Sequence, residues 1–264
     1  MRGIVPTGLA VRIWPLRPLA LAAGVLCTLG GCAGTGSPQA DKAATLDETP
    51  TLRLARAARA AGDYASAVNL YRTLLPSSAD PLMRIELGDT LLDAGSIDDA
   101  IQTYKGVPAG SPAQLGAALG LERAYLALND VPEAVRQADR AHALAPDDKR
   151  VLIDRGVALD LAGRHAEAQD SYRAALAKAP GERPARVDLA LSLALTKKYD
   201  QAAEIVKPIA VSTTATPRER QILALIYGLM GNEREARQWS LRDLDAGTTA
   251  ENMRFYDYVR DGGR

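Results

Sequence analysis

The sequence predicts an all-α protein built as a solenoid of short helices, on the strength of its composition and its internal repetition. The chain has 264 residues and is 47% hydrophobic, which is enough to bury a core. Alanine and leucine dominate the apolar residues, whereas the whole chain holds one Phe, two Trp and nine Tyr. Small side chains and leucine suit closely packed helices.

A repeat of 34 residues runs through most of the chain. Alanine recurs at steps of 33, 34, 34, 34 and 34 residues, and the residues around each alanine agree in character. These alanines are Ala67, Ala100, Ala134, Ala168, Ala202 and Ala236. Four positions later stands a residue that we expect to fill the layer beside the alanine: Tyr71, Tyr104, Ala138, Tyr172, Val206 and Ser240. Regular repetition at this period predicts six stacked units.

Turn and capping residues divide each repeat into two helices. A residue suited in most copies to a left-handed backbone stands five positions before each alanine and ends the first helix: Gly62, Gly95, Asn129, Gly163, Lys197 and Gly231. Asp63, Ser96 and Asp130 follow as N-caps of second helices. First helices are expected to start where a capping residue precedes proline, namely at Thr49-Pro50, Asp80-Pro81, Ser111-Pro112 and Thr216-Pro217.

This pattern resembles the tetratricopeptide repeat (TPR) family over roughly residues 48–247. The resemblance implies six repeats over 49–247, coiled into a right-handed superhelix. The chain departs from the family in lacking a large aromatic residue near the start of each first helix. Lys197 stands where the turn glycine is usual, and repeat 6 carries Glu233 and Ser240 at usually apolar positions.

Residues 248–264 are predicted to form a capping helix and a disordered tail. The helix is expected over 249–260 and contains the only phenylalanine of the chain. A repeat stack must cover its apolar end, so we interpret this segment as a cap. The alternative is an aromatic docking patch formed by Phe255, Tyr256 and Tyr258.

The N-terminus has the pattern of an export signal. A basic region up to Arg17 precedes an apolar run from Leu19 to Leu29, which is too short to span a bilayer. The run ends at Gly30-Gly31-Cys32 and, with Leu29, resembles the lipobox of bacterial lipoproteins. The resemblance implies removal of residues 1–31 and lipidation of Cys32, whose acyl chains would anchor the protein firmly.

Residues 32–48 are therefore predicted to be the lipidated cysteine and a tether, and the tether is expected to be flexible because the segment is polar and lacks periodicity. The alternative is a plain secretory signal with an incidental cysteine. Cys27 competes as acceptor, but it follows the bulky Leu26 inside the apolar run. Ala33 stands where an inner-membrane retention signal would place Asp, which by family resemblance implies the outer membrane of a Gram-negative cell.

Charge and motifs argue against several functions. Lysine plus arginine equals aspartate plus glutamate at 32 each, so no net field favours nucleic acid. Removing residues 1–31 leaves 29 basic and 32 acidic groups. His142 and His165 lack metal-ligand spacing, and no strand-linked phosphate loop occurs. We therefore expect no catalytic site, no metal, no cofactor and no small-molecule substrate.

In the TPR family the first helices line a binding groove, mainly through the fifth and ninth positions of each repeat. The candidate groove residues on these positions are Ile85, Asp89, Leu119, Arg123, Ile153, Val157, Val187, Leu191 and Leu225. The middle of the groove is therefore aliphatic, unlike the subclass that clamps a terminal carboxylate with Lys and Asn. An amphipathic helix or an extended apolar segment is the expected ligand. Alternatively, several of these side chains are buried between repeats.

The layout of lipobox, short tether, six repeats and a small C-terminal helix resembles the TadD-type component of the tight-adherence (Flp) pilus system. The resemblance implies a non-enzymatic outer-membrane lipoprotein that binds a secretin or another pilus assembly component. One alternative is the pilotin type of type IV pili, which assists secretin assembly. Another is an envelope scaffold that recruits peptidoglycan enzymes or outer-membrane assembly machinery. An enzyme or regulator is least favoured, since no unassigned segment is long enough for a further domain.

Overall fold

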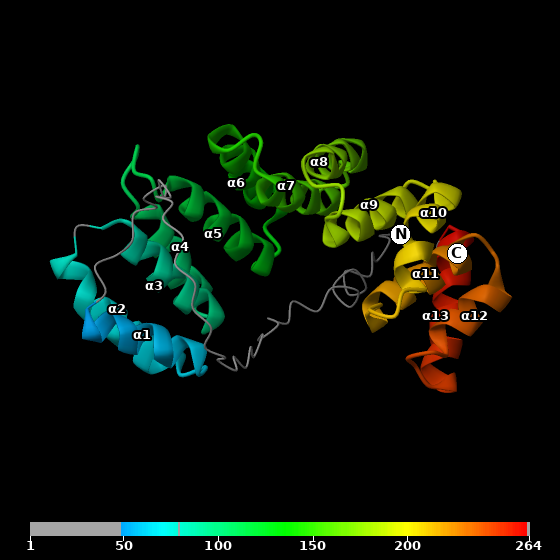
Figure 1. Ribbon diagram of the computed structural model, residues 1–264, viewed down its shortest axis with the longest axis horizontal. Helices are drawn as coiled ribbons and strands as arrows, with labels where there is room; N and C mark the ends of the chain where they lie inside the picture. The colour runs from blue at the N-terminus through cyan, green and yellow to red at the C-terminus, as the bar shows by residue number, and fades with distance from the viewer. Residues whose placement is uncertain (1–48, 79, 263–264) are drawn as a thin grey trace, which may run out of the picture. The chain divides into compact units, whose positions relative to one another are not determined.

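The computed structural model describes residues 49–78 and 80–262, and within them it is helical apart from the turns (Figure 1). The all-α prediction is confirmed. Six helix pairs follow one another, then a final helix α13 (Ala246–Arg260). The pairs are α1 (Pro50–Ala60) with α2 (Tyr64–Leu74), α3 (Leu82–Asp93) with α4 (Ile97–Lys105), α5 (Gln114–Ala127) with α6 (Val131–Leu144), α7 (Lys149–Leu161) with α8 (His165–Lys178), α9 (Arg183–Leu195) with α10 (Tyr199–Ala210), and α11 (Pro217–Leu229) with α12 (Glu233–Ser240). The predicted signal, Cys32 and the tether lie outside the described residues.

Neighbouring helices pack in chain order, and the first helices also contact one another. Within each pair the two helices contact each other extensively, and each second helix then contacts the next first helix. In addition α3 contacts α5, α5 contacts α7, α7 contacts α9, and α9 contacts α11. The first helices α3, α5, α7, α9 and α11 therefore form one continuous surface, which we call the first-helix face.

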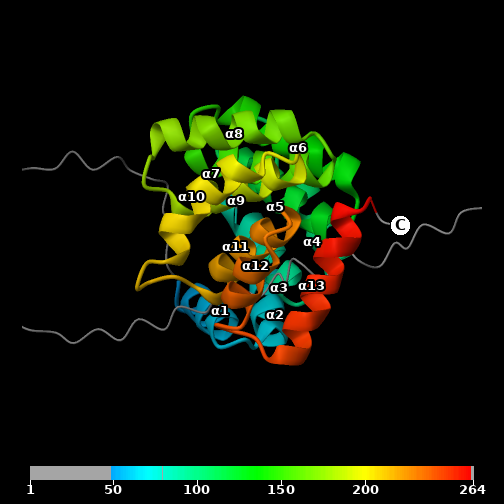
Figure 2. The same ribbon diagram turned by 90° about the vertical axis from the view of Figure 1, so that its right-hand side faces the viewer.

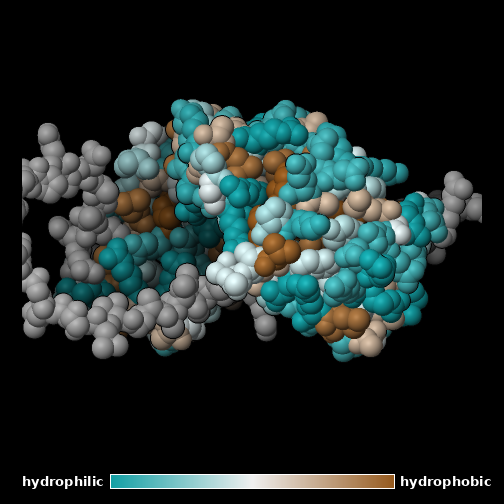
Figure 3. Space-filling model, turned by 45° about the vertical axis from the view of Figure 1, so that its right-hand side comes forward, coloured by the Kyte–Doolittle hydropathy of each residue, from teal (hydrophilic) through white to brown (hydrophobic). Residues whose placement is uncertain are grey.

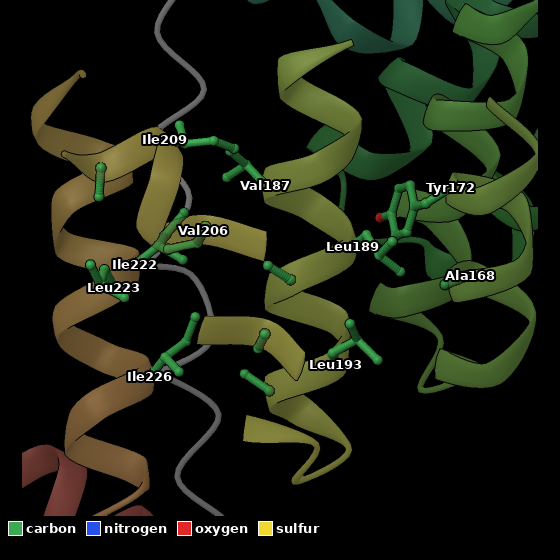
Figure 4. Close-up of a cluster of buried hydrophobic side chains, with 14 of the residues drawn as sticks. Ala168, Tyr172, Val187, Leu189, Leu193, Val206, Ile209, Ile222, Leu223 and Ile226 are labelled. Atoms are coloured by element: carbon green, nitrogen blue, oxygen red, sulfur yellow. The ribbon is translucent and has the colours of Figure 1, made fainter. Parts of the chain in front are cut away.

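The six alanines of the repeat lie at the closest packing of each pair. All six have 0% exposure, as expected for positions where only a small side chain allows two helices to approach. Four residues further on, the side chains are buried as well, including Tyr71, Tyr104 and Tyr172. Figure 4 shows Ala168 and Tyr172 of α8 beside Leu189 and Leu193 of α9, within the largest buried cluster.

A glycine faces the tyrosine ring in two repeats. A Cβ atom at Gly88 would lie 2.5 Å from Cε1 of Tyr104, which is far closer than two carbon atoms can approach. A Cβ atom at Gly156 would overlap the ring of Tyr172 in the same way. The first helix has no side chain at these points, so the ring of the second helix can lie against its backbone.

The turn residues adopt the backbone that the sequence predicts. All six positions before the second helices have positive φ, including Asn129 at 57° and Lys197 at 62°. Asp63 and Asp130 accept hydrogen bonds from backbone amides in the first turns of α2 and α6, whereas Ser96 makes no such side-chain bond. Left-handed turns thus end first helices even where glycine is replaced.

Two of the four predicted first-helix starts agree with the structure: Thr49 caps α1, and Thr216 forms a capping box with Glu219. The start predicted at Asp80-Pro81 is one residue early, because α3 begins at Leu82 and Pro81 is its N-cap, although Asp80 accepts a hydrogen bond of 2.8 Å from the amide of Leu82. The start predicted at Ser111-Pro112 is wrong, because α5 begins at Gln114. The carbonyl of Ser111 accepts from the amide of Gln114 at 3.1 Å, so a turn precedes the helix and the serine hydroxyl does not cap it.

Helix α13 packs on the last pair, as a capping helix should. It contacts α11 and α12 and lies beside them in Figures 1 and 2. Met253 and Tyr256 are buried, and a Cβ atom at Gly228 of α11 would overlap the Tyr256 ring. Tyr258 is 47% exposed. Tyr256 therefore packs inside the cap, whereas Tyr258 faces outward.

The contact between glycine and tyrosine can be tested with a matched pair of alanine substitutions. Gly156→Ala and Gly116→Ala both replace a glycine within a helix, so both gain helix propensity, by up to about 1 kcal/mol. Only Gly156→Ala forces a Cβ into a buried ring, since the nearest side-chain atom to a Cβ at Gly116 is 3.4 Å away. Gly156→Ala should therefore be less stable than Gly116→Ala by about 1–3 kcal/mol in urea unfolding. Equal midpoints for the two variants would contradict the packing described.

Candidate functional site

The predicted groove residues all lie on the first-helix face, but at different depths. Ile85 and Asp89 are on α3, Leu119 and Arg123 on α5, Ile153 and Val157 on α7, Val187 and Leu191 on α9, and Leu225 on α11. Leu119 and Val187 are buried, with 8% and 1% exposure, so they belong to the core between repeats. The others are half-buried except Arg123, which is exposed. Seven of the nine positions therefore reach the surface.

Charged groups near the N-terminal end of the first-helix face form ion pairs with one another. Nη2 of Arg123 lies 2.6 Å from Oδ1 of Asp89, and the hydroxyl of Tyr104 donates to the same oxygen at 2.6 Å. Burial, followed by the Asp89 charge, raises the pKa of Tyr104 above its usual value. Arg56 and Glu86 form an equivalent pair at 2.6 Å. These charges join neighbouring repeats to each other, and Arg123 and Asp89 are not a free ligand site.

The middle of the first-helix face presents aliphatic side chains. Ile153, Val157 and Leu191 are half-buried, and they are joined by Leu161 and Leu195, which are 51% and 54% exposed. Figure 3 shows that apolar side chains on the face it displays gather in patches within a mostly hydrophilic surface. Large exposed apolar side chains of this kind mark sites of protein interaction when they are contiguous.

Leu161 and Leu195 were missed because only the fifth and ninth positions were considered. Each stands four residues after a ninth-position residue, Val157 or Leu191. Residues four apart lie on the same side of a helix. A search for apolar residues at this spacing would have found both.

Three carboxyl groups on helices of the first-helix face have raised pKa values. The repeat pattern in the sequence does not indicate them. Glu122 of α5 is 2% exposed, and burial, followed by the charge of Asp154, raises its pKa to about 8. Burial likewise raises the pKa of Asp154 on α7 and of Asp188 on α9. Asp188 has a partner, since Nη2 of Arg218 lies 3.2 Å from its Oδ1.

The remaining polar clusters are structural in character. Nδ1 of His165 lies 2.8 Å from Oδ1 of Asp160, which also accepts a hydrogen bond from Ser192 at 2.7 Å, while Tyr172 donates to the other carboxylate oxygen. In the part of the chain that the structure describes, no group of three His, Cys, Asp or Glu residues is arranged to hold a metal ion. Over residues 49–78 and 80–262, no helix combines the length and the apolar character needed to cross a membrane.

Comparisons with protein families identify the repeat throughout this surface. Two family models, both described as tetratricopeptide repeat, match the chain. The first matches residues 52–114 and 120–183, and the second matches residues 161–226. Together these ranges include most of α1, α5 and α11 and the whole of the other helices from α2 to α10.

Individual relatives agree with this assignment. A tetratricopeptide repeat protein from Parabacteroides merdae superposes with a TM-score of 0.66 at 16% identity over 81% of this chain and 86% of its own. TTC0263, a thermophilic TPR protein of Thermus thermophilus, gives 0.53 at 24% identity over 67% and 96% of the two chains. These likenesses concern the fold alone.

One curated relative is similar in sequence. The uncharacterized protein y4yS of Sinorhizobium fredii is 37% identical over 90 residues, which are 34% of this chain and 50% of the relative. The chain thus spans about half the length of that relative.

Proposed function

Because the chain belongs to the tetratricopeptide repeat family, we propose that it is a protein-binding scaffold whose ligand lies on the first-helix face. Proteins of this family act as interaction scaffolds. The observation that carries the proposal is a row of apolar side chains on α7 and α9 that are half-buried or exposed. This apolar row consists of Ile153, Val157, Leu161, Leu191 and Leu195. An extended or helical apolar segment of a partner would remove this row from water.

The scaffold works, in our proposal, at the periplasmic face of the outer membrane. The lipobox ending in Cys32 supports a lipid anchor there. From Cys32 to Thr49 the chain has 17 steps, which gives a flexible tether a span of roughly 20–25 Å. The repeats would therefore bind their partner close to the membrane surface.

The partner, in the same proposal, is a component of a pilus or secretion apparatus, such as a secretin subunit. The support is the layout of the sequence, which resembles TadD-type assembly lipoproteins of the Flp pilus. A scaffold held near the membrane could retain such a chain until it assembles.

Membrane attachment is tested by replacing the acceptor cysteine. Cys32→Ser should move the protein from the membrane fraction to the soluble fraction after cell breakage, because the acyl chains supply the anchor. Cys27→Ser is the matched control and should remain in the membrane fraction. If Cys32→Ser stayed in the membranes and needed detergent for release, the lipid anchor would be refuted.

Partner capture is tested by placing charge on the apolar row. The double variant Leu161→Asp with Leu195→Asp should reduce the yield of specifically crosslinked partner by about tenfold or more in the native envelope, since each substitution opposes apolar burial. Circular dichroism should remain unchanged, because both side chains are exposed. Leu144→Asp alters a leucine of the second helix α6 that is 47% exposed, and it should capture partners normally. Equal loss in both variants would exclude the first-helix face as the specific site.

A further inference from the structure

The second helix of repeat 2 is shorter than those of the two repeats that follow it. Helix α4 has 9 residues, whereas α6 and α8 have 14 each. The five positions that would complete α4, residues 106–110, instead begin the loop to α5. Pro108 has no amide donor and Gly110 has a φ of 76°, and neither feature suits a helix interior. At this place the stack therefore lacks more than one turn of helix.

A pocket of about 390 Å³ lies between the end of α4, the loop, α5 and α6. Its apolar lining comes from three parts of the chain, namely Tyr104 of α4, Val107 of the loop, and Ala117 with Leu121 of α5. The volume falls within the range of pockets that bind small molecules, roughly 300–1,000 Å³. It is enough to enclose a branched aliphatic group together with a polar group attached to it.

This pocket is separate from the groove positions of the first-helix face. The α5 residues that line it, Gln114, Ala117 and Leu121, follow one another at intervals of three and four residues, so they lie on one side of the helix. The groove positions Leu119 and Arg123 each stand two residues after a pocket residue, which is roughly 200° around a helix. They therefore lie on the other side of α5, and a ligand in the pocket leaves the apolar row free.

Two cationic side chains line the pocket without an acidic partner. Lys105 comes from the last position of α4 and Arg140 from α6. Nζ of Lys105 lies 5.9 Å from the centre of the Tyr125 ring, and Nη2 of Arg140 donates to Oε1 of Gln114 at 2.9 Å. These neutral groups orient the cations but do not neutralise them. Among the described residues, neither cation forms an ion pair and no acidic side chain lines the pocket.

A third polar group of the lining is also unpaired. Gln137 stands three residues before Arg140 on α6, so the two side chains leave the same side of the helix. Oε1 of Gln137 is buried and has no hydrogen-bond partner. Because the oxygen is the buried atom, the amide nitrogen is the atom left for a ligand, and it is a donor. The polar part of the pocket therefore offers positive charge and hydrogen-bond donors.

We propose that this pocket binds a small aliphatic carboxylate. The carboxylate accepts charge-assisted hydrogen bonds from Lys105 and Arg140, and Gln137 donates a further bond. The aliphatic part packs on Val107 and Leu121 and leaves water. The same chemistry occurs in a free branched carboxylic acid and in the last residue of a peptide that ends in leucine. The site goes beyond the proposed scaffold function, since it does not use the apolar row.

Isocaproate is the probe, and its binding to the purified full chain is measured by ligand-observed NMR titration. Binding should be saturable. Isocaproamide has the same aliphatic part without the charge, and it should bind about tenfold or more weakly. Acetate and inorganic phosphate lack the aliphatic part and should be weaker by a similar factor. An acetylated glycyl-glycyl-leucine peptide with a free carboxylate separates the two sources. Tighter binding of the peptide would identify a chain end as the ligand, and tighter binding of isocaproate a free acid.

Variants of the protein assign the binding to the pocket. Lys105→Met with Arg140→Met keeps the apolar stems of two exposed side chains, so this variant should fold, bind isocaproate about tenfold or more weakly, and bind isocaproamide as before. The control, Lys207→Met with Arg254→Met, removes the same charges from exposed positions of α10 and α13 and should bind isocaproate normally.

Three results would overturn the site: no saturable binding of isocaproate or the peptide, equal affinity for isocaproate and isocaproamide, or isocaproate binding unaffected by Lys105→Met with Arg140→Met. Leu161→Asp with Leu195→Asp should bind isocaproate normally, because those leucines do not line the pocket. Failure of the pocket is therefore distinguishable from failure of the proposed scaffold function.

Discussion

The structure depends on how closely the two helices of each repeat approach. Six alanines with 0% exposure set that distance, and any larger side chain would push the helices apart. Glycine opposite tyrosine extends the same close contact along the pair in repeats 2 and 4. Because the ring is then held in one place, its hydroxyl reaches a carboxylate of the first helix, as Tyr104 reaches Asp89. Arg123 of the next repeat binds that carboxylate, so packing within one pair also fixes the register of the next.

This arrangement determines which groups are left to bind a partner. Near the N-terminal end of the first-helix face the charged side chains pair with one another and join neighbouring repeats. Arg56 pairs with Glu86, and Arg123 pairs with Asp89. The second helices face the cores of the pairs with their alanines and tyrosines. The groove positions that remain at the surface of α7 and α9, Ile153, Val157 and Leu191, are aliphatic. Where repeat 3 has Ala138 in place of the tyrosine, Glu122 stands at the glycine position and is buried, at 2% exposure.

Repeat periodicity was sufficient to predict the fold. Spacing alone located the six buried alanines and the left-handed turns, including the turn at Lys197, because these features depend on local backbone geometry. The helix start at Ser111 was mispredicted since a turn competes with the cap. Periodicity placed all nine groove residues on the correct helices but could not give their depth, which depends on side chains of neighbouring helices and buries Leu119 and Val187. The lipid anchor at Cys32 stays a prediction, since it lies outside the described residues.

Glu122 shows a second limit of prediction. An acid at the glycine position is visible in the sequence, and so is the small Ala138 at the tyrosine position 16 residues later. Only the structure shows that both residues are buried, at 2% and 1% exposure. The depth of a side chain is thus a property of the stack.

The central claim is that the partner is held by the first-helix face, and site-specific photo-crosslinking in living cells tests it most directly. A photoreactive amino acid would be introduced at the position of Val157 on α7, or at that of Leu144 on the second helix α6. Our account predicts a discrete adduct with one envelope protein from position 157 and none from position 144. An adduct from position 144 alone would contradict it.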